Sequence, residues 1–261
     1  MKYDHRYHAG NFADLIKHIV FQQVILYSQL KDTPTHIVDT HSGFGSYPLN
    51  ELTYEAKQGI LALPGRVWSC SLMIQYYKAI EPILAQGIFP GSPILAAILK
   101  RTGDSLWAFE KYEEPFSALE NALIRFEKTY AKQDNGLSGL KSLRPPAYKR
   151  SIVLIDPPYE RLEEYTELAQ TLEYAAKKFL QGTYIIWYPH SKRVGIMSPI
   201  FEVAKKWGEK VLIVDYYRNN GDLEGLSGAG LLVLNPPFNL KDQLNAARDD
   251  LASLGFELVL S

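Results

Sequence analysis

Cysteine is almost absent from this sequence, which has one, Cys70, in 261 residues. A single cysteine excludes a disulfide framework and a zinc site built from cysteines. No apolar run approaches the roughly 20 residues that a membrane-spanning helix needs. Charged residues and histidines interrupt the first twenty positions, which excludes the apolar core of a secretion signal. We therefore expect a protein of the reducing cytoplasm, without membrane attachment or bound metal.

A surplus of basic residues is also missing, because 28 Lys and Arg face 29 Asp and Glu for a net charge of −1. A nucleic-acid-binding domain usually carries a basic surplus. If this protein binds nucleic acid, local basic clusters such as residues 141–150 and 190–193 must supply the contacts. Hydrophobic content of 46% and charged content of 22% are typical of a globular domain.

Apolar patterns along the chain alternate between strands and helices, which predicts a parallel sheet with helices on both faces. Residues 218–227 are too few for a helical crossover, so the strand after them should run antiparallel. This seven-stranded, mostly parallel sheet with an antiparallel last strand resembles the α/β layout of the Rossmann-like class I methyltransferases. We expect strands at residues 36–39, 105–110, 126–130, 152–155, 183–188, 211–217 and 230–234, and helices at 12–30, 115–124, 163–179 and 240–254, with further helices from 92 and up to 207.

The segment between the first two strands is too long for a simple crossover. It has a helical pattern in which Leu72, Tyr76, Ile80 and Ile83 share one stripe. We expect an inserted helical subdomain at residues 49–90, so that residues 1–48 and 91–261 together form the main domain.

Two proline motifs end strands: Asp156-Pro157-Pro158-Tyr159 and Asn235-Pro236-Pro237-Phe238. Proline cannot donate to a sheet ladder, so each strand must stop there. Ligands of open α/β sheets bind beyond the carboxyl ends of the parallel strands. Asp156 falls at that edge, whereas the reversed last strand carries Asn235 to the opposite edge. The first motif is therefore the candidate site.

The predicted neighbours of Asp156 have a specific chemistry. The loop after the first strand contains Gly43 and Gly45, where a backbone can pass close to a ligand. Pro48 stands where a dinucleotide fingerprint has its third glycine, which argues against NAD. Glu110, at the end of the second strand, is placed to accept hydrogen bonds from ribose hydroxyls. Together these features indicate S-adenosylmethionine beside an amino-nitrogen substrate.

An exocyclic adenine amine is a poor nucleophile because its lone pair is delocalised into the ring. Hydrogen bonds from its N–H groups to the Asp156 carboxylate and the Pro157 carbonyl would orient the nitrogen toward a methyl donor. Tyr159 offers a flat face on which an unstacked base can lie. The motif therefore predicts methylation of an amino nitrogen without a metal.

Longer stretches closely resemble the RlmJ family of bacterial 23S ribosomal RNA adenine-N6 methyltransferases, over essentially the whole chain. The most specific is the opening YHAGNFADLIKH at residues 7–18. The resemblance continues at residues 39–43, 90–93, 156–160, 186–189 and 235–237. It implies a monomer that uses S-adenosylmethionine and acts on 23S ribosomal RNA.

By position, the resemblance places cofactor contacts at residues scattered along the chain and the proton acceptor at Asp156. Tyr3 matches a tyrosine near the substrate adenine. One position departs from the family, because its Asp-Gly pair is replaced by Asn135-Gly136, with Asp134 one residue earlier. Whether Asn135 or Asp134 contacts the cofactor adenine is open. The implied cofactor contacts are His18, His41, Ser92, Glu110, Asn135 and Gly136, with Gly43 and Asp156.

Two alternatives share these features. A DNA adenine methyltransferase would use the same Asp-Pro-Pro-Tyr chemistry, although the sequence has no separate target-recognition domain beyond the insertion. A non-catalytic RNA-binding protein could keep the same fold without turnover. A titration with S-adenosylmethionine tests the second alternative, because a non-catalytic protein is expected not to bind it. Methylation assays on RNA and on duplex DNA test the first alternative.

Overall fold

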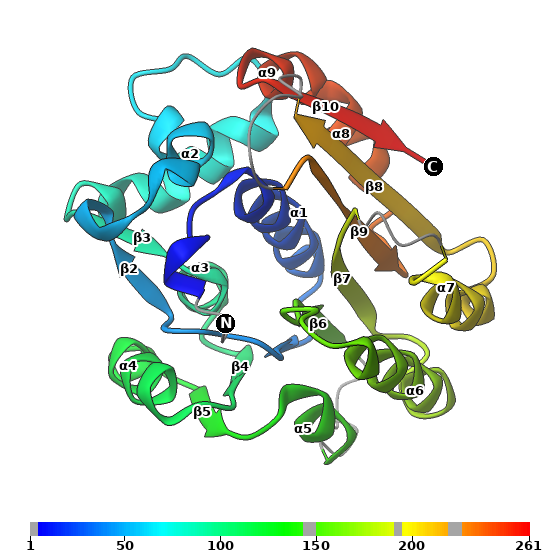
Figure 1. Cartoon of the computed structure of the whole chain (residues 1–261). Helices are drawn as coiled ribbons and strands as arrows, with labels where there is room; N and C mark the ends of the chain where they lie inside the picture. Colours follow the sequence, from blue (N-terminus) through cyan, green and yellow to red (C-terminus); the bar gives the residue numbers. More distant parts are fainter. Residues whose placement is uncertain (1–4, 143–149, 191–194, 219–225) are drawn as a thin grey trace.

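The computed structural model describes residues 5–142, 150–190, 195–218 and 226–261. A central sheet has the strand order β10-β8-β9-β7-β6-β1-β4-β5 (Figure 1). Its strands are β1 (His36–Asp39), β4 (Ser105–Glu110), β5 (Thr129–Gln133), β6 (Ser151–Ile155), β7 (Thr183–Pro189), β8 (Val211–Arg218), β9 (Gly228–Leu234) and β10 (Phe256–Leu260).

The expected direction of the strands is confirmed. Strands β5, β4, β1, β6 and β7 pair in parallel, and β9 runs antiparallel to both β7 and β8. The expected number is corrected, because β10 adds an eighth strand that pairs antiparallel with β8. Buried Phe256 and Leu258 alternate with exposed Glu257 and Val259, as in an edge strand with one covered face.

Helices cover both faces of the sheet. Successive side chains along a strand point alternately into the hydrophobic core on one face and the core on the other. Ile152 and Leu154 of β6 pack in the core on one face, and Val153 and Ile155 pack in the core on the other. The first face carries α1 (Phe12–Ser28), α3 (Ser92–Leu99), α4 (Glu113–Leu123), α8 (Leu240–Ala246) and α9 (Arg248–Ser253); the second carries α5 (Gly136–Ser142), α6 (Leu162–Lys178) and α7 (Ser198–Ala204).

Helix α1 lies near the centre of the molecule (Figure 1). Asn11 caps it, since its side-chain oxygen accepts from the backbone N–H groups of Ala13 at 2.9 Å and Asp14 at 3.1 Å. The helix is buried over most of its length because α2 (Ser71–Leu84), α3 and the sheet all contact it. Its polar residues Asp14, Lys17 and His18 are buried as well.

Residues 49–90 are less helical than the sequence pattern predicts. Strands β2 (Ser46–Pro48) and β3 (Ile88–Pro90) pair at the base of this segment, and α2 is its one α-helix. Short 3-10 turns occupy Leu49–Glu51, Tyr54–Gln58 and Ile60–Ala62. Pro64 and Gly65, which has φ of +76°, interrupt the pattern before α2.

Smaller differences concern element ends. Strand β5 begins at Thr129, three residues later than expected, and the predicted helix 240–254 is divided into α8 and α9 at Ala247. The short helix α5 was not predicted, because two glycines weaken its helical pattern. Within the described residues, no helix is both long and apolar enough to span a membrane.

Candidate active site

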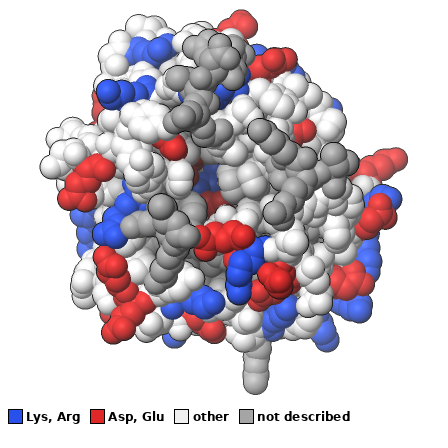
Figure 2. All heavy atoms as spheres, viewed as in Figure 1, with Lys and Arg blue, Asp and Glu red and all other residues white. Residues whose placement is uncertain are grey.

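A cavity of about 510 Å³ opens at the carboxyl edge of the parallel strands. The loop after β1, the end of β4, the segment after β5 and the motif after β6 all contribute to its wall. Figure 2 shows this face of the molecule, which is hollowed near its centre. The cavity brings together six of the residues predicted for the cofactor site: His41, Gly43, Glu110, Asn135, Gly136 and Asp156.

Backbone geometry fixes the floor of this cavity. Gly43 and Gly45 have φ of +56° and +77°, in the left-handed region that favours glycine. Glu110 accepts from the backbone N–H of Gly43 at 3.1 Å and from that of Tyr112 at 2.8 Å. Gly136 packs so closely on Thr40 that a Cβ there would clash with the Thr40 carbonyl oxygen. The carboxylate and the two backbone segments are therefore held in place before a ligand arrives.

Asp156 follows β6 directly and forms an ion pair with Lys17 of α1. The Lys17 ammonium also donates to Asp14 Oδ1 at 2.6 Å, and Asp14 Oδ2 accepts from the backbone N–H of Gly10 at 2.9 Å. The Lys17 and Asp14 side chains are each 5% exposed. The sequence prediction missed Lys17 as a site residue. The sequence shows Asp14 three residues before Lys17, but the pairing of Lys17 with Asp156 depends on the fold.

Behind the glycine loop, Asp39 is fully buried at the end of β1. Its Oδ2 accepts from the Ser92 hydroxyl at 2.6 Å and its Oδ1 from the His41 backbone N–H at 3.2 Å. Burial raises the pKa of Asp39 to about 6, although Ser92 and Lys17 act in the opposite direction. Burial lowers the pKa of His41 to about 4, so its imidazole is neutral at pH 7.

Two predicted cofactor contacts do not line the cavity. His18 is 1% exposed, its Nδ1 lies 3.3 Å from the Tyr76 hydroxyl, and its ring stacks on Phe89. Ser92 is buried against Asp39. Their partners Tyr76, Phe89 and Asp39 are not among the residues that line the cavity either.

The segment after β5 contains the two residues that are candidates for contacting the cofactor adenine, Asn135 and Asp134, and only one of them lines the cavity. Asn135 lines the cavity, and its Oδ1 accepts from the backbone N–H groups of Leu137 at 2.9 Å and Ser138 at 3.1 Å. Asp134 is not among the lining residues, and its carboxylate accepts from the Asn135 backbone N–H at 2.7 Å.

Tyr159 is held in a strained conformation with φ of +53°. Its hydroxyl donates to the Trp187 carbonyl oxygen at 2.7 Å, and its ring centre lies 4.6 Å from that of Tyr165. Pro157 and Pro158 line the cavity, whereas Tyr159 does not. Its ring is therefore fixed beside the cavity. Tyr3 lies outside the described residues.

The second proline motif lies at the opposite edge of the sheet, as predicted. Strand β9 pairs antiparallel with β7, with Leu234 opposite Tyr184 near the start of β7. Asn235 has φ of +51°, and its Nδ2 donates to the carbonyl oxygens of Leu180 at 2.5 Å and Gly182 at 2.9 Å. These bonds give Asn235 a structural role in a strand-ending turn. Across the described part of the chain, no group of three His, Cys, Asp or Glu residues could hold a metal ion.

Comparisons with known proteins find similarity over nearly the whole chain. A family model described as "Ribosomal RNA large subunit methyltransferase D, RlmJ" matches residues 32–255. The chain is 34% identical over 258 residues to the ribosomal RNA large subunit methyltransferase J of Haemophilus influenzae, covering 94% of this chain and 90% of that protein. Identity to the Escherichia coli protein of the same name is 31% over 257 residues, with the same coverage.

A solved structure agrees as well. Protein LPL1258 of Legionella pneumophila superposes with a TM-score of 0.88 at 31% identity, covering 97% of this chain and 98% of that one. The matched family residues 32–255 include strands β1 to β9 and every residue of the cavity wall except Arg6. This chain belongs to the RlmJ family of ribosomal RNA large subunit methyltransferases.

Proposed function

We propose that this protein transfers a methyl group from S-adenosylmethionine to N6 of an adenine in 23S ribosomal RNA. The observation that carries the proposal is the position of Asp156-Pro157-Pro158 at the carboxyl end of β6, in the wall of the cavity that also holds Gly43 and Glu110. Family membership supports the same reaction class.

The residues around the cavity fit the cofactor. Its volume of about 510 Å³ lies within the range usual for small-molecule sites. Glu110 uses two backbone donors and keeps acceptor sites for ribose hydroxyls. Gly43 and Gly136 let the backbone approach a ligand closely. When bound, S-adenosylmethionine supplies an electrophilic methyl group on a positively charged sulfur. We propose His18, His41, Ser92, Asn135 and Asp156 as further contacts.

Asp156 and the Pro157 carbonyl would hold the target amine. Lys17 binds one oxygen of Asp156, Oδ2, and leaves Oδ1 to accept an N6–H. The buried ammonium also compensates the carboxylate charge and fixes its position, which is the preorganisation that electrostatic catalysis requires. We propose that the Asp156 carboxylate accepts the proton that the amine loses after methylation. Tyr159 would stack on the flipped base, with Tyr3 on the substrate side.

We further propose that residues 49–90 form an inserted subdomain on a methyltransferase domain made of residues 1–48 and 91–261. The pairing of β2 with β3 supports this, because it closes the segment at its base. We expect the protein to act as a monomer in the cytoplasm, without a metal ion.

Mass spectrometry of ribosomal RNA nucleosides from a strain that lacks this protein tests the proposal. We expect one N6-methyladenosine of 23S RNA to disappear and to return with the wild-type gene. An unchanged level at every 23S position would contradict the proposal. Parallel assays with purified protein on deproteinised 23S RNA and duplex DNA identify the substrate; a preference for duplex DNA would favour a DNA adenine methyltransferase.

A further inference from the structure

Asn135 replaces an aspartate of the family pattern, and its acceptor capacity is already used. A carboxamide oxygen has two lone pairs. Both are engaged by the backbone N–H groups of Leu137 and Ser138, which begin helix α5. Asn135 could accept from the amine of a cofactor adenine only by giving up one of these capping bonds. The cavity wall therefore lacks a free acceptor at this position.

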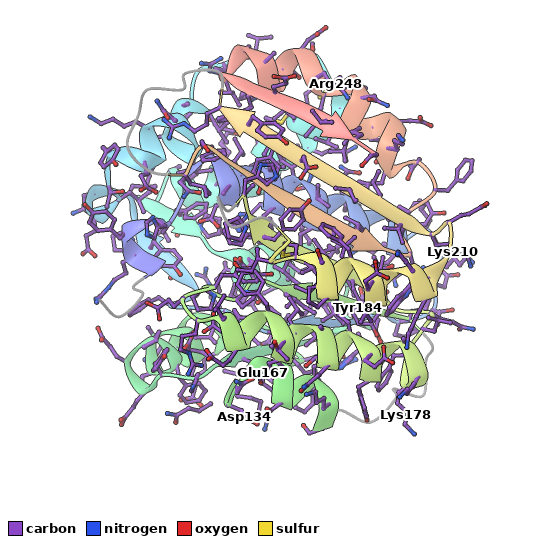
Figure 3. All side chains as sticks on the ribbon, turned by 45° about the vertical axis from the view of Figure 1, so that its right-hand side comes forward. Asp134, Glu167, Lys178, Tyr184, Lys210 and Arg248 are labelled. Atoms are coloured by element: carbon purple, nitrogen blue, oxygen red, sulfur yellow. The ribbon has the colours of Figure 1, made fainter. Side chains whose placement is uncertain are left out.

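Helix α6 brings another carboxylate to the same cavity. Glu164 stands in the first turn of α6 and lines the cavity together with Asn135 and Gly136. Helices α5 and α6 pack against each other. Figure 3 shows Glu167 on α6 and Asp134 below it, on the segment between β5 and α5. Glu164 belongs to the turn of α6 that precedes Glu167 and is nearer to the Asp156 motif.

The Glu164 carboxylate is under-satisfied. Its side chain is 14% exposed, and its nearest cation is Arg161, whose Nε lies 3.7 Å from Oε1. Oε2 is buried and has no hydrogen-bond partner among the described residues. A buried carboxylate oxygen without a donor costs free energy, and native proteins rarely keep one unless a ligand or water supplies the bond. The side chain as a whole is 14% exposed and lines the cavity, so a turn of the carboxylate would bring an oxygen to a donor on a ligand there.

We infer that Glu164 accepts a hydrogen bond from the exocyclic amine of the cofactor adenine, in place of the family aspartate at position 135. This inference depends on the proposed function, because it assigns a specificity contact for S-adenosylmethionine. A carboxylate favours a 6-amino group, which donates, and disfavours a 6-oxo group, which presents another oxygen. Glu164 therefore selects adenine over hypoxanthine in the cofactor.

The test compares the dissociation constants of S-adenosylhomocysteine and S-inosylhomocysteine, which differ at the purine 6-position, by calorimetry. We expect the wild-type protein to prefer the adenine compound by roughly 10- to 100-fold, as for loss of a hydrogen bond to a charged group. Glu164→Gln should reduce this preference to within about threefold, because an amide can turn its NH₂ toward the 6-oxo group. The ratio compares two ligands on one preparation, so partial unfolding of the variant does not change it.

Glu167→Gln is the matched control, since Glu167 lines the same cavity one turn farther along α6. We expect it to keep the wild-type preference. An unchanged preference in Glu164→Gln, or a loss of preference in Glu167→Gln alone, would overturn the inference while leaving the proposed function intact. Failure of the wild-type protein to bind either compound would overturn both.

Discussion

Lys17 joins helix α1 to the catalytic motif, because its ammonium donates to Asp14 Oδ1 at 2.6 Å and also binds Asp156 Oδ2. Burial alone would lower the pKa of Lys17, but the two carboxylates outweigh it and hold the pKa well above its ordinary value. Lys17 is therefore charged at any pH at which the protein works. One buried cation between two carboxylates keeps the Asp156 side chain in a fixed position.

Lys17→Met should impair both folding and catalysis. It leaves Asp14 buried without its cation, and breaking a buried pair in this way typically costs about 3–5 kcal/mol. Turnover by the folded fraction should fall about 10²–10³-fold, as for loss of one preorganised electrostatic contact. Urea unfolding and single-turnover methylation measure the two effects. Lys205→Met, which removes an exposed pair with Glu202, is the control and should change neither. Wild-type turnover in Lys17→Met would disprove the role of this cation.

Glu110→Ala should weaken cofactor binding more than the chemical step. The change removes the proposed ribose acceptor and releases the Gly43 N–H from its partner. We expect the dissociation constant of S-adenosylmethionine to rise about 10- to 100-fold by calorimetry, as for loss of hydrogen bonds to a charged group. Glu114→Ala is the matched control, since Glu114 lines the cavity but is 72% exposed and binds Arg6. Equal losses in the two variants would contradict the assignment to Glu110.

Tyr159→Phe tests the contribution of the Tyr159 ring apart from that of its hydroxyl. It removes the donor to the Trp187 carbonyl oxygen, at a cost to stability of about 1 kcal/mol, and keeps the aromatic face. We expect methylation within about fivefold of wild type for Tyr159→Phe and a much larger rise in KM for RNA in Tyr159→Ala, which loses base stacking of about 1–3 kcal/mol. Steady-state kinetics on a 23S fragment measure both. Comparable kinetics for the two variants would exclude stacking on this ring.

Asp39→Asn should make the protein more sensitive to acid. Burial lowers the pKa of His36 and His41 from 6.5 to about 4, so the unfolded chain binds more protons than the native one in that window and stability falls as pH falls. Burial raises the pKa of Asp39 from 3.8 to about 6, so the native state binds the extra proton there and stability rises as pH falls from 6. Asp39→Asn removes this opposing effect.

Urea unfolding between pH 7 and pH 4 measures the result. The free energy of unfolding of Asp39→Asn should decrease more steeply below about pH 6 than that of the wild type, since Asp39 then no longer opposes the histidines. Parallel pH profiles for the two proteins would show that Asp39 titrates normally in the native state.

The sequence was most informative where local chemistry restricts the backbone. The prolines after Asp156 and Asn235 end their strands, and the short link before β9 requires a reversed strand, so the edge on which each motif lies could be predicted. The positions of the glycine loop and of Glu110 at the cavity could be predicted from the same topology. In these places the residue types allow few conformations.

Other features depend on tertiary contacts that no local pattern reveals. Lys17 looks like a solvated helix residue until the fold places Asp156 beside it. Residues 49–70 have apolar spacing but form short 3-10 turns, and Gly59, between two of these turns, packs directly on Gly10 and Asn11 of the opening segment. Strand β10 was not predicted from its own residues, and its pairing with β8 defines it. The occupied cap at Asn135 could be recognised only from the helix that it begins.

The central claim is that chemistry occurs at Asp156 and not at the second proline motif, and turnover of Asp156→Ala against Asn235→Ala tests it most directly. Asp156→Ala should lower kcat about 10²–10³-fold while the S-adenosylmethionine dissociation constant stays within a few-fold, because Gly43 and Glu110 are unchanged. Asn235→Ala removes two hydrogen bonds from a left-handed turn at the far edge, so it should cost about 1–3 kcal/mol of stability and leave kcat within a few-fold. Loss of methylation in folded Asn235→Ala, with full turnover in Asp156→Ala, would contradict this assignment of the active site.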